Sequence, residues 1–273
     1  MKTGSTAFQE LMVKNRELLC ERGIRFRGIR RSELDQLEAL MDEEQAKGWP
    51  AVLLLSHECL CRVAPERLKQ AFSRAPTQPK AVLVARRLRE IYPSLYLQNL
   101  KGHVMRTSSY REFLAEQSAR DQSPELATRG QVFRHRFLEQ QLAAAGCQVS
   151  WVRYSRDHLI QDLLSWTGDQ GCLPLGPDDL VPLPPPRGIS PRRSLDGAVV
   201  DVARVLNRQC RNGIITASVR EQLLSALLDS SDQIRTERQG PDCFRSAHDG
   251  ELDALDDELN GDFWRETFPS QQS

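Results

Sequence analysis

Residues 80–85 read Lys-Ala-Val-Leu-Val-Ala, and residues 51–55 read Ala-Val-Leu-Leu-Leu. Both are continuous apolar runs of strand length, the pattern typical of strands that are covered on both faces. A helical pattern occupies residues 65–73 between them. Apolar strands that alternate with helices indicate a parallel sheet, so these runs predict an α/β fold.

The alternation continues outward from these two runs. Short strands are expected at residues 23–26 and 148–154, and helices at residues 32–47, 92–100, 132–145 and 159–166. Pro93 leaves the start of one helix open, and Ser109 with Glu112 has the spacing of a capping box. We predict one three-layer domain over residues 1–273, with a central, mainly parallel sheet flanked by helices.

Two segments carry no motif of their own. Residues 173–191 are rich in proline and are expected to form a loop. Residues 249–258 are acidic and are expected to form a solvated helix face. Loops commonly carry binding specificity, and residues 102–129 and 173–191 are the stretches where it is expected.

Composition excludes several classes of protein. Lysine plus arginine and aspartate plus glutamate number 37 each, so no net charge attracts nucleic acid or an acidic membrane. No apolar run reaches the roughly 18 residues of a membrane span, and no signal-peptide core is present, so a cytoplasmic protein is expected. Seven cysteines without paired spacing favour reduced thiols, with Cys59 and Cys61 as ordinary buried residues. The histidines show no zinc-ligand spacing, and no metal is expected.

The N-terminus carries the strongest chemical signal. Lys2-Thr3-Gly4-Ser5-Thr6 precedes a helical pattern that contains Phe8 and Leu11. Backbone N–H groups, hydroxyls and one ammonium at a helix start can bind a phosphate or sulfate. Such a pentapeptide by itself is more often an ordinary serine or threonine cap, so the interpretation needs support from other segments.

Two strand ends supply that support. The run at 51–55 leads into Ser56-His57-Glu58, and the run at 80–85 leads into Arg86-Arg87. In parallel sheets, ligands bind beyond the carboxyl ends of the strands, so these groups are expected to converge. The glycines of a nucleotide triphosphatase loop and a magnesium-binding aspartate at a strand end are absent, which points away from metal-assisted phosphoryl transfer.

Lys2-Thr3-Gly4-Ser5-Thr6-Ala7-Phe8-Gln9 resembles the loop K-T-G-[ST]-T-x-x-Q of bacterial sulfotransferases that use 3′-phosphoadenosine 5′-phosphosulfate (PAPS). Arg86 with Ser94 is similar to the second motif of that family, and Ser56-His57-Glu58 resembles its S-x-E element. Further similar stretches follow in the same order, at residues 15–19, 95–98, 109–114, 155–168 and 190–207. The resemblance covers most of the chain.

The resemblance implies a nucleotide-binding P-loop fold and a transferase. The reaction would move a sulfuryl group from PAPS to a hydroxyl or amine of a saccharide or another small acceptor, without a metal. Lys2 would neutralise the leaving phosphate, while Thr3, Gly4, Ser5 and Thr6 hold the 5′-phosphosulfate.

The resemblance also assigns the remaining roles. Arg86 and Ser94 would hold the 3′-phosphate of the cofactor. Glu58, or His57 at the same strand end, would act as the general base that takes the acceptor proton.

In this family a strand that is central in the sheet leads into the phosphate loop, so we expect that the true start lies upstream of Met1. Three alternatives stay open: a truncated, non-catalytic relative that binds nucleotide or a partner, a degenerate P-loop kinase that needs magnesium, and an interaction domain. The acceptor and the oligomeric state are not specified by the sequence.

Overall fold

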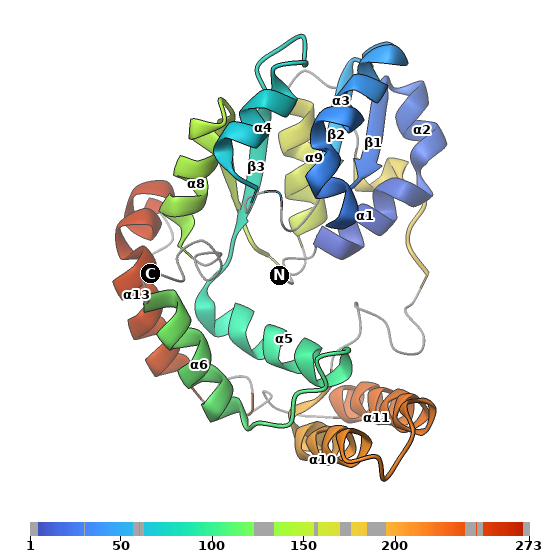
Figure 1. The fold of residues 1–273 in the computed structure, drawn as a ribbon, viewed down its shortest axis with the longest axis vertical. Coiled ribbons are helices and arrows are strands. Elements are labelled where there is room, and N and C mark those ends of the chain that lie inside the picture. The colour runs from blue at the N-terminus through green and yellow to red at the C-terminus, as the bar shows by residue number, and fades with distance from the viewer. Residues whose placement is uncertain are drawn as a thin grey trace. The chain divides into compact units, whose positions relative to one another are not determined.

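The structure is a computed structural model that describes residues 5–29, 31–56, 60, 63–122, 134–155, 158–169, 176–184, 195–237, 244 and 248–269. The chain groups into two compact units. The sheet unit comprises residues 3–86, 125–183 and 260–273, and the helical unit comprises residues 1–2, 87–124 and 184–259. Each unit is described by itself below (Figure 1).

The sheet unit contains four described strands in two parallel pairs. β1 (Ile24–Gly28) pairs with β2 (Val52–Ser56), and β3 (Lys80–Ala85) pairs with β4 (Gln148–Arg153). The predicted α/β class and the parallel direction are confirmed, and the predicted strands lie within two residues of the observed ones. The single central sheet that we predicted is in two parts among the described residues, since no hydrogen-bonded ladder joins β2 to β3.

Helices surround these strands. Their bounds are α1 Ser5–Lys14, α2 Arg16–Glu21, α3 Leu37–Ala46, α4 Pro65–Phe72, α8 His135–Ala144 and α9 Leu159–Asp169. Short 3₁₀ helices η1 (Arg31–Gln36) and η4 (Pro177–Asp179) accompany them. The helix predicted over residues 32–47 is instead a 3₁₀ turn followed by α3, and Leu34 of the turn packs against the same core as Leu37 of α3.

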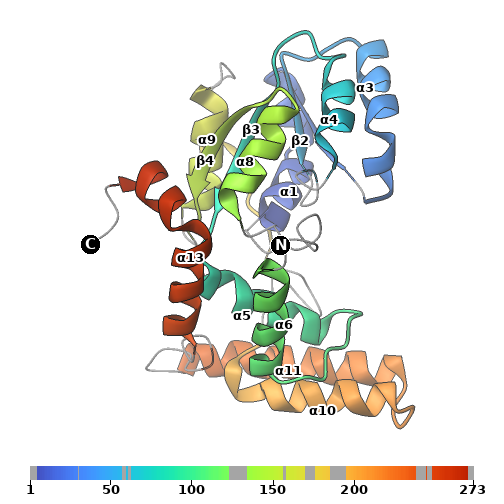
Figure 2. The same cartoon turned by 60° about the vertical axis from the view of Figure 1, so that its left-hand side comes forward.

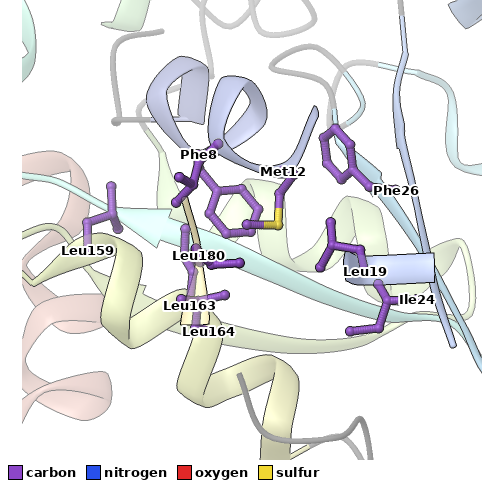
Figure 3. Close-up of a cluster of buried hydrophobic side chains, with 10 residues drawn as sticks. Phe8, Met12, Leu19, Ile24, Phe26, Leu159, Leu163, Leu164 and Leu180 are labelled. Atoms are coloured by element: carbon purple, nitrogen blue, oxygen red, sulfur yellow. The ribbon is translucent and has the colours of Figure 1, made fainter. Parts of the chain in front are cut away.

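Two hydrophobic cores lie on opposite faces of the strands. The first core joins α1 and α9 to alternate strand residues such as Phe26, Leu54 and Val84, and Figure 3 shows part of it. The second joins α3, α4 and α8 to the intervening residues, such as Leu55 and Leu83. Figure 2 shows α9 and α8 on opposite sides of the β3–β4 pair. Both strand pairs therefore contribute to both cores, as the strands of one layer do.

The backbone ladder shows which strand edges are unpaired. Val52 donates its N–H to the carbonyl of Gly23, and Ile29 donates to the carbonyl of Ser56. Backbone groups alternate along a strand, so Leu53 and Leu55 direct theirs away from β1.

The same argument applies to the other pair. Gln148 donates its N–H to Pro79, and Tyr154 donates to Ala85, so Val82 and Val84 direct their backbone groups away from β4. We call these two sides of β2 and β3 the open edges; Figure 1 shows β2 lying between β1 and β3.

Burial along the strands agrees with this geometry. Ile24 and Phe26 of the outer strand β1 are only 2% and 7% exposed. Every residue of β2 is only partly buried, although β2 lies further inside. An inner strand with a neighbour on each side would be the more buried one, so the open edge of β2 is less covered than an interior edge.

The helical unit contains α5 (Leu88–Lys101), α6 (Tyr110–Gln122), η5 (Gly197–Val199), α10 (Val200–Arg211) and α11 (Ala217–Glu237), together with the first part of α13 (Asp249–Thr267). α5 continues through Pro93. Among the described helices of the chain, none combines the length and the apolar character needed to span a bilayer.

Local predictions hold well in this unit. The backbone N–H of Ser109 donates to Glu112 (2.6 Å), and the N–H of Glu112 donates to the Ser109 hydroxyl (3.2 Å), which is the predicted capping box. Tyr92 and Tyr96 are fully buried and pack on Phe113.

The acidic segment 249–258 is helical, but its predicted solvation is wrong at Asp256. That side chain is fully buried, and Arg87 lies 3.1 Å from its carboxylate. Arg89 lies 3.0 Å from Asp253 in the same way. The basic residues at the start of α5 provide counter-charges that a reading of the acidic segment alone does not reveal.

Candidate functional site

The predicted phosphate loop leads into a helix, as expected. α1 begins at Ser5, the fourth residue of the predicted loop. Lys2, Thr3 and Gly4 lie outside the described residues, and so do the side chains of Ser5 and Thr6. Their roles in binding the 5′-phosphosulfate stay predictions.

Gln9 connects α1 with the end of β2. Its side-chain amide donates a 2.9 Å hydrogen bond to the hydroxyl of Ser56, the last residue of β2. Gln9 is the final residue of the first sequence motif, and Ser56 is the first of the S-x-E element. Two stretches that the sequence treats separately therefore meet at one edge of the strands. His57 and Glu58, the candidate bases, lie outside the described residues.

Arg86 stands immediately after β3 and is buried. Its guanidinium carbon lies 4.1 Å from the centroid of the Tyr154 ring, and Tyr154 is the first residue after β4. The Tyr154 N–H donates to the Ala85 carbonyl at 2.7 Å, which fixes the two strand ends side by side. Stacking on an aromatic face orients a guanidinium plane and holds a permanent cation at this edge.

Ser94, the predicted partner of Arg86, lies within α5 and is buried. It belongs to the helical unit, whereas Arg86 belongs to the sheet unit. The joint 3′-phosphate site of these two residues therefore stays a prediction.

Sequence reasoning did not single out Gln9 and Tyr154 as site residues. Gln9 was part of the quoted motif, and a polar residue one turn into a helix that follows an anion loop was the available signal. The ring of Tyr154 could not be paired with Arg86 without the register of β3 against β4.

Other candidate groups take structural positions. Arg136 pairs with Glu139 (2.7 Å) and with Glu266. His135 is buried and stacks on Phe263. Cys147 is a buried free thiol, and burial raises its pKa. Within the described ranges, no three or more His, Cys, Asp or Glu side chains come together in a metal-binding group.

No family model matches this chain, and the searches of curated proteins and of solved structures each return no match. The functional assignment therefore depends on the motifs and on where the fold carries them.

Proposed function

We propose that this protein is a sulfotransferase that uses PAPS, and that the sheet unit carries Arg86 and most of the phosphate loop. The observation that supports this most directly is the hydrogen bond between Gln9 and Ser56. It brings the helix that follows the phosphate loop to the carboxyl end of β2. In parallel strands the carboxyl ends share one edge, where Arg86 also stands after β3.

The arrangement of helices gives independent support for a P-loop-like topology. β1, β2, β3 and β4 follow one another across the unit, and the connecting helices α3, α4 and α8 all pack in the second core. Connections between parallel strands are right-handed. Helices that pack on the same face of a sheet therefore belong to connections that move across the sheet in the same direction. α1 packs in the first core, on the opposite face, and leads into β1.

The connection through α1 therefore runs in the reverse direction, from a position beyond β2 back to β1. A strand leading into Lys2 would fit between the open edges of β2 and β3, where it would gain a partner on each side. The phosphate loop would then stand above the middle of a five-stranded parallel sheet. This is the placement that the resemblance implies.

The chemistry proposed for the site is charge placement. PAPS supplies an activated sulfuryl group. Lys2 would bind the oxygen that becomes the leaving phosphate, and the N–H groups at the start of α1 would hold the remaining oxygens. Arg86 would bind the 3′-phosphate through its guanidinium. Glu58 or His57 would accept the proton of the acceptor hydroxyl or amine.

The test is calorimetric titration of the purified chain with 3′-phosphoadenosine 5′-phosphate, with ADP as the control ligand. Binding is expected without magnesium and only when the 3′-phosphate is present. Lys2→Ala and Arg86→Lys should each weaken binding by roughly tenfold or more. Lys2→Ala removes a charge-assisted contact, and Arg86→Lys keeps the charge but removes the planar group that can donate two parallel hydrogen bonds. Arg111→Lys is the matched control, since Arg111 is an exposed arginine on α6.

Equal binding of ADP and 3′-phosphoadenosine 5′-phosphate by a folded chain would contradict the proposal. Binding of ATP that depends on magnesium would favour the degenerate kinase instead. Binding of the 3′-phosphorylated ligand without sulfuryl transfer to any offered saccharide would favour the non-catalytic relative.

A further inference from the structure

A cavity of about 620 Å³ lies along the outer edge of β1. Its volume is within the roughly 300–1,000 Å³ that ligand sites occupy. All of its lining residues belong to the sheet unit: Val13, Arg16, Arg25, Phe26, Arg27, Gly28, Glu44 and Lys47. None of them belongs to the proposed cofactor site.

One wall of the cavity is an unpaired strand edge. The ladder to β2 uses the backbone groups of Arg25 and Arg27, as the bonds at Val52 and Ile29 require. Phe26 and Gly28 therefore direct their N–H and C=O groups outward, and within the described part of the chain no hydrogen bond reaches them. Four residues of β1 line the cavity, and Phe26 and Gly28 are the two of them that are uncharged.

A buried carboxylate organises the cations on one side of this edge. The Glu44 side chain is 1% exposed, with one oxygen 2.6 Å from Arg25 and the other 3.1 Å from Arg27. Burial works against ionisation of Glu44, but the hydrogen bonds from Arg25 and Arg27 outweigh it and hold its pKa below the usual range. Lys47 lies 3.8 Å from the same carboxylate.

The other nearby carboxylates lie outside the cavity lining. Glu43 pairs with Arg27 (2.9 Å) and Lys47 (2.6 Å), and Glu33 lies 3.6 Å from Arg27. Glu44 is thus the one carboxylate among the lining residues, against four cationic side chains. Arg16 is exposed and forms no ion pair with a described residue, so its charge is available to a ligand.

The opposite side of the edge carries Val13 of α1, which is 61% exposed, and Arg16 at the start of α2. The Phe26 side chain packs into the first core. A strand added to β1 would direct alternate side chains to these two sides, because side chains alternate along a strand. One set would meet Arg25, Arg27 and Lys47, and the other would meet Val13 and Arg16.

We propose that this edge binds a short, extended peptide segment of a partner protein in which acidic and apolar residues alternate. The segment adds to β1 as a further strand, through the backbone groups of Phe26 and Gly28. These groups are two residues apart, about 7 Å, so a segment of about four residues spans the site. A free small anion would use the cations but neither the strand edge nor Val13. The proposal does not depend on the sulfotransferase assignment.

The test is fluorescence anisotropy of the full chain with a labelled peptide, Glu-Val-Glu-Val-Glu. Saturable binding is expected, with affinity that falls as salt rises, and the peptide Lys-Val-Lys-Val-Lys should not bind. Two N-methylated forms of the acidic peptide separate strand addition from simple charge attraction, one methylated at the valine amides and the other at the glutamate amides. Only one set of amides can face β1. The affinity of the peptide methylated on that set should therefore fall by about tenfold or more, and the other methylated peptide should bind like the unmethylated parent.

A protein variant gives a second, independent readout. Arg16→Gln should lower the affinity for the acidic peptide by roughly three- to fivefold, because the variant removes one exposed charge. Arg111→Gln, the same change at an exposed arginine outside the cavity, should leave binding unchanged. The proposal would be overturned if both N-methylated peptides bound as tightly as the parent peptide, or if the two protein variants changed binding equally. It would also be overturned if citrate or a short RNA displaced the peptide fully and N-methylation had no effect.

Discussion

Asn207→Ala is expected to destabilise the helical unit strongly. Asn207 is fully buried on α10, and its amide donates to the carbonyls of Leu100 and Arg106, each at 2.8 Å. Its carbonyl oxygen accepts a 2.7 Å hydrogen bond from Arg220. These contacts bind the C-terminal end of α5 to α10 and α11.

The magnitude follows from the groups that lose partners. Leu100 keeps a bond from Arg220 at 3.0 Å, but the Arg106 carbonyl and the buried Nε–H of Arg220 lose the partner they have in the structure. Each buried polar group left unsatisfied costs about 1–3 kcal/mol, so the free energy of unfolding should fall by about 2–6 kcal/mol. At a typical denaturant slope, this lowers the urea midpoint by roughly 1–3 M.

Two probes locate the effect. The four tryptophans, Trp49, Trp151, Trp166 and Trp264, all belong to the sheet unit. Their fluorescence therefore reports on that unit, whereas far-ultraviolet circular dichroism reports on the helices of both units. Asn212→Ala, at an exposed asparagine near the end of the same helix, is the matched control. A circular dichroism midpoint for Asn207→Ala no lower than that of the control would refute the reasoning.

Two further predictions concern the open edges and Tyr96. In hydrogen exchange followed by NMR, the amides of Leu53 and Val82 on the open edges should exchange faster than those of Leu54 and Leu83, which belong to the paired ladders; equal protection would mean that the open edges are paired. Burial raises the pKa of Tyr96 to about 12, above its ordinary value of 10.0, so the stability contributed by the neutral phenol is present below pH 10 and is lost as pH rises from 10 toward 12. Unfolding midpoints of wild type and Tyr96→Phe over this range check the sign, since a decline of equal size in both would contradict it.

The parts of the fold that were predictable are those specified locally. The apolar run at residues 80–85 defines β3 to the residue, because a strand covered on both faces needs no information from elsewhere. The capping box at Ser109 was likewise encoded within four residues. The predicted phosphate loop could be connected to a helix for the same reason.

The parts that were missed depend on partners distant in the sequence. Asp256 is buried because Arg87, 169 residues away, supplies its counter-charge. Tyr154 supports Arg86 only because β3 and β4 lie side by side in register. In each case the sequence around the residue is also compatible with an exposed position, so the sequence alone favoured an ordinary surface side chain.

Three buried or half-buried arginine environments show why charge alone does not identify an anion site. Arg220 is buried, and burial lowers its pKa, yet it donates to the carbonyls of Leu100 and Gly102 at the C-terminal end of α5. The negative end of the helix dipole compensates that cation without a ligand. Arg25 is compensated by Glu44.

Arg86 differs in its position more than in its charge. It follows a parallel strand directly, at the edge where Gln9 meets Ser56, and it is oriented by an aromatic face. A ring engages the face of a guanidinium, whereas phosphates bind to its N–H groups in the plane, so the two interactions are geometrically compatible. Placement at the carboxyl edge of the strands is therefore what singles out Arg86, among many arginines, for the proposed 3′-phosphate contact.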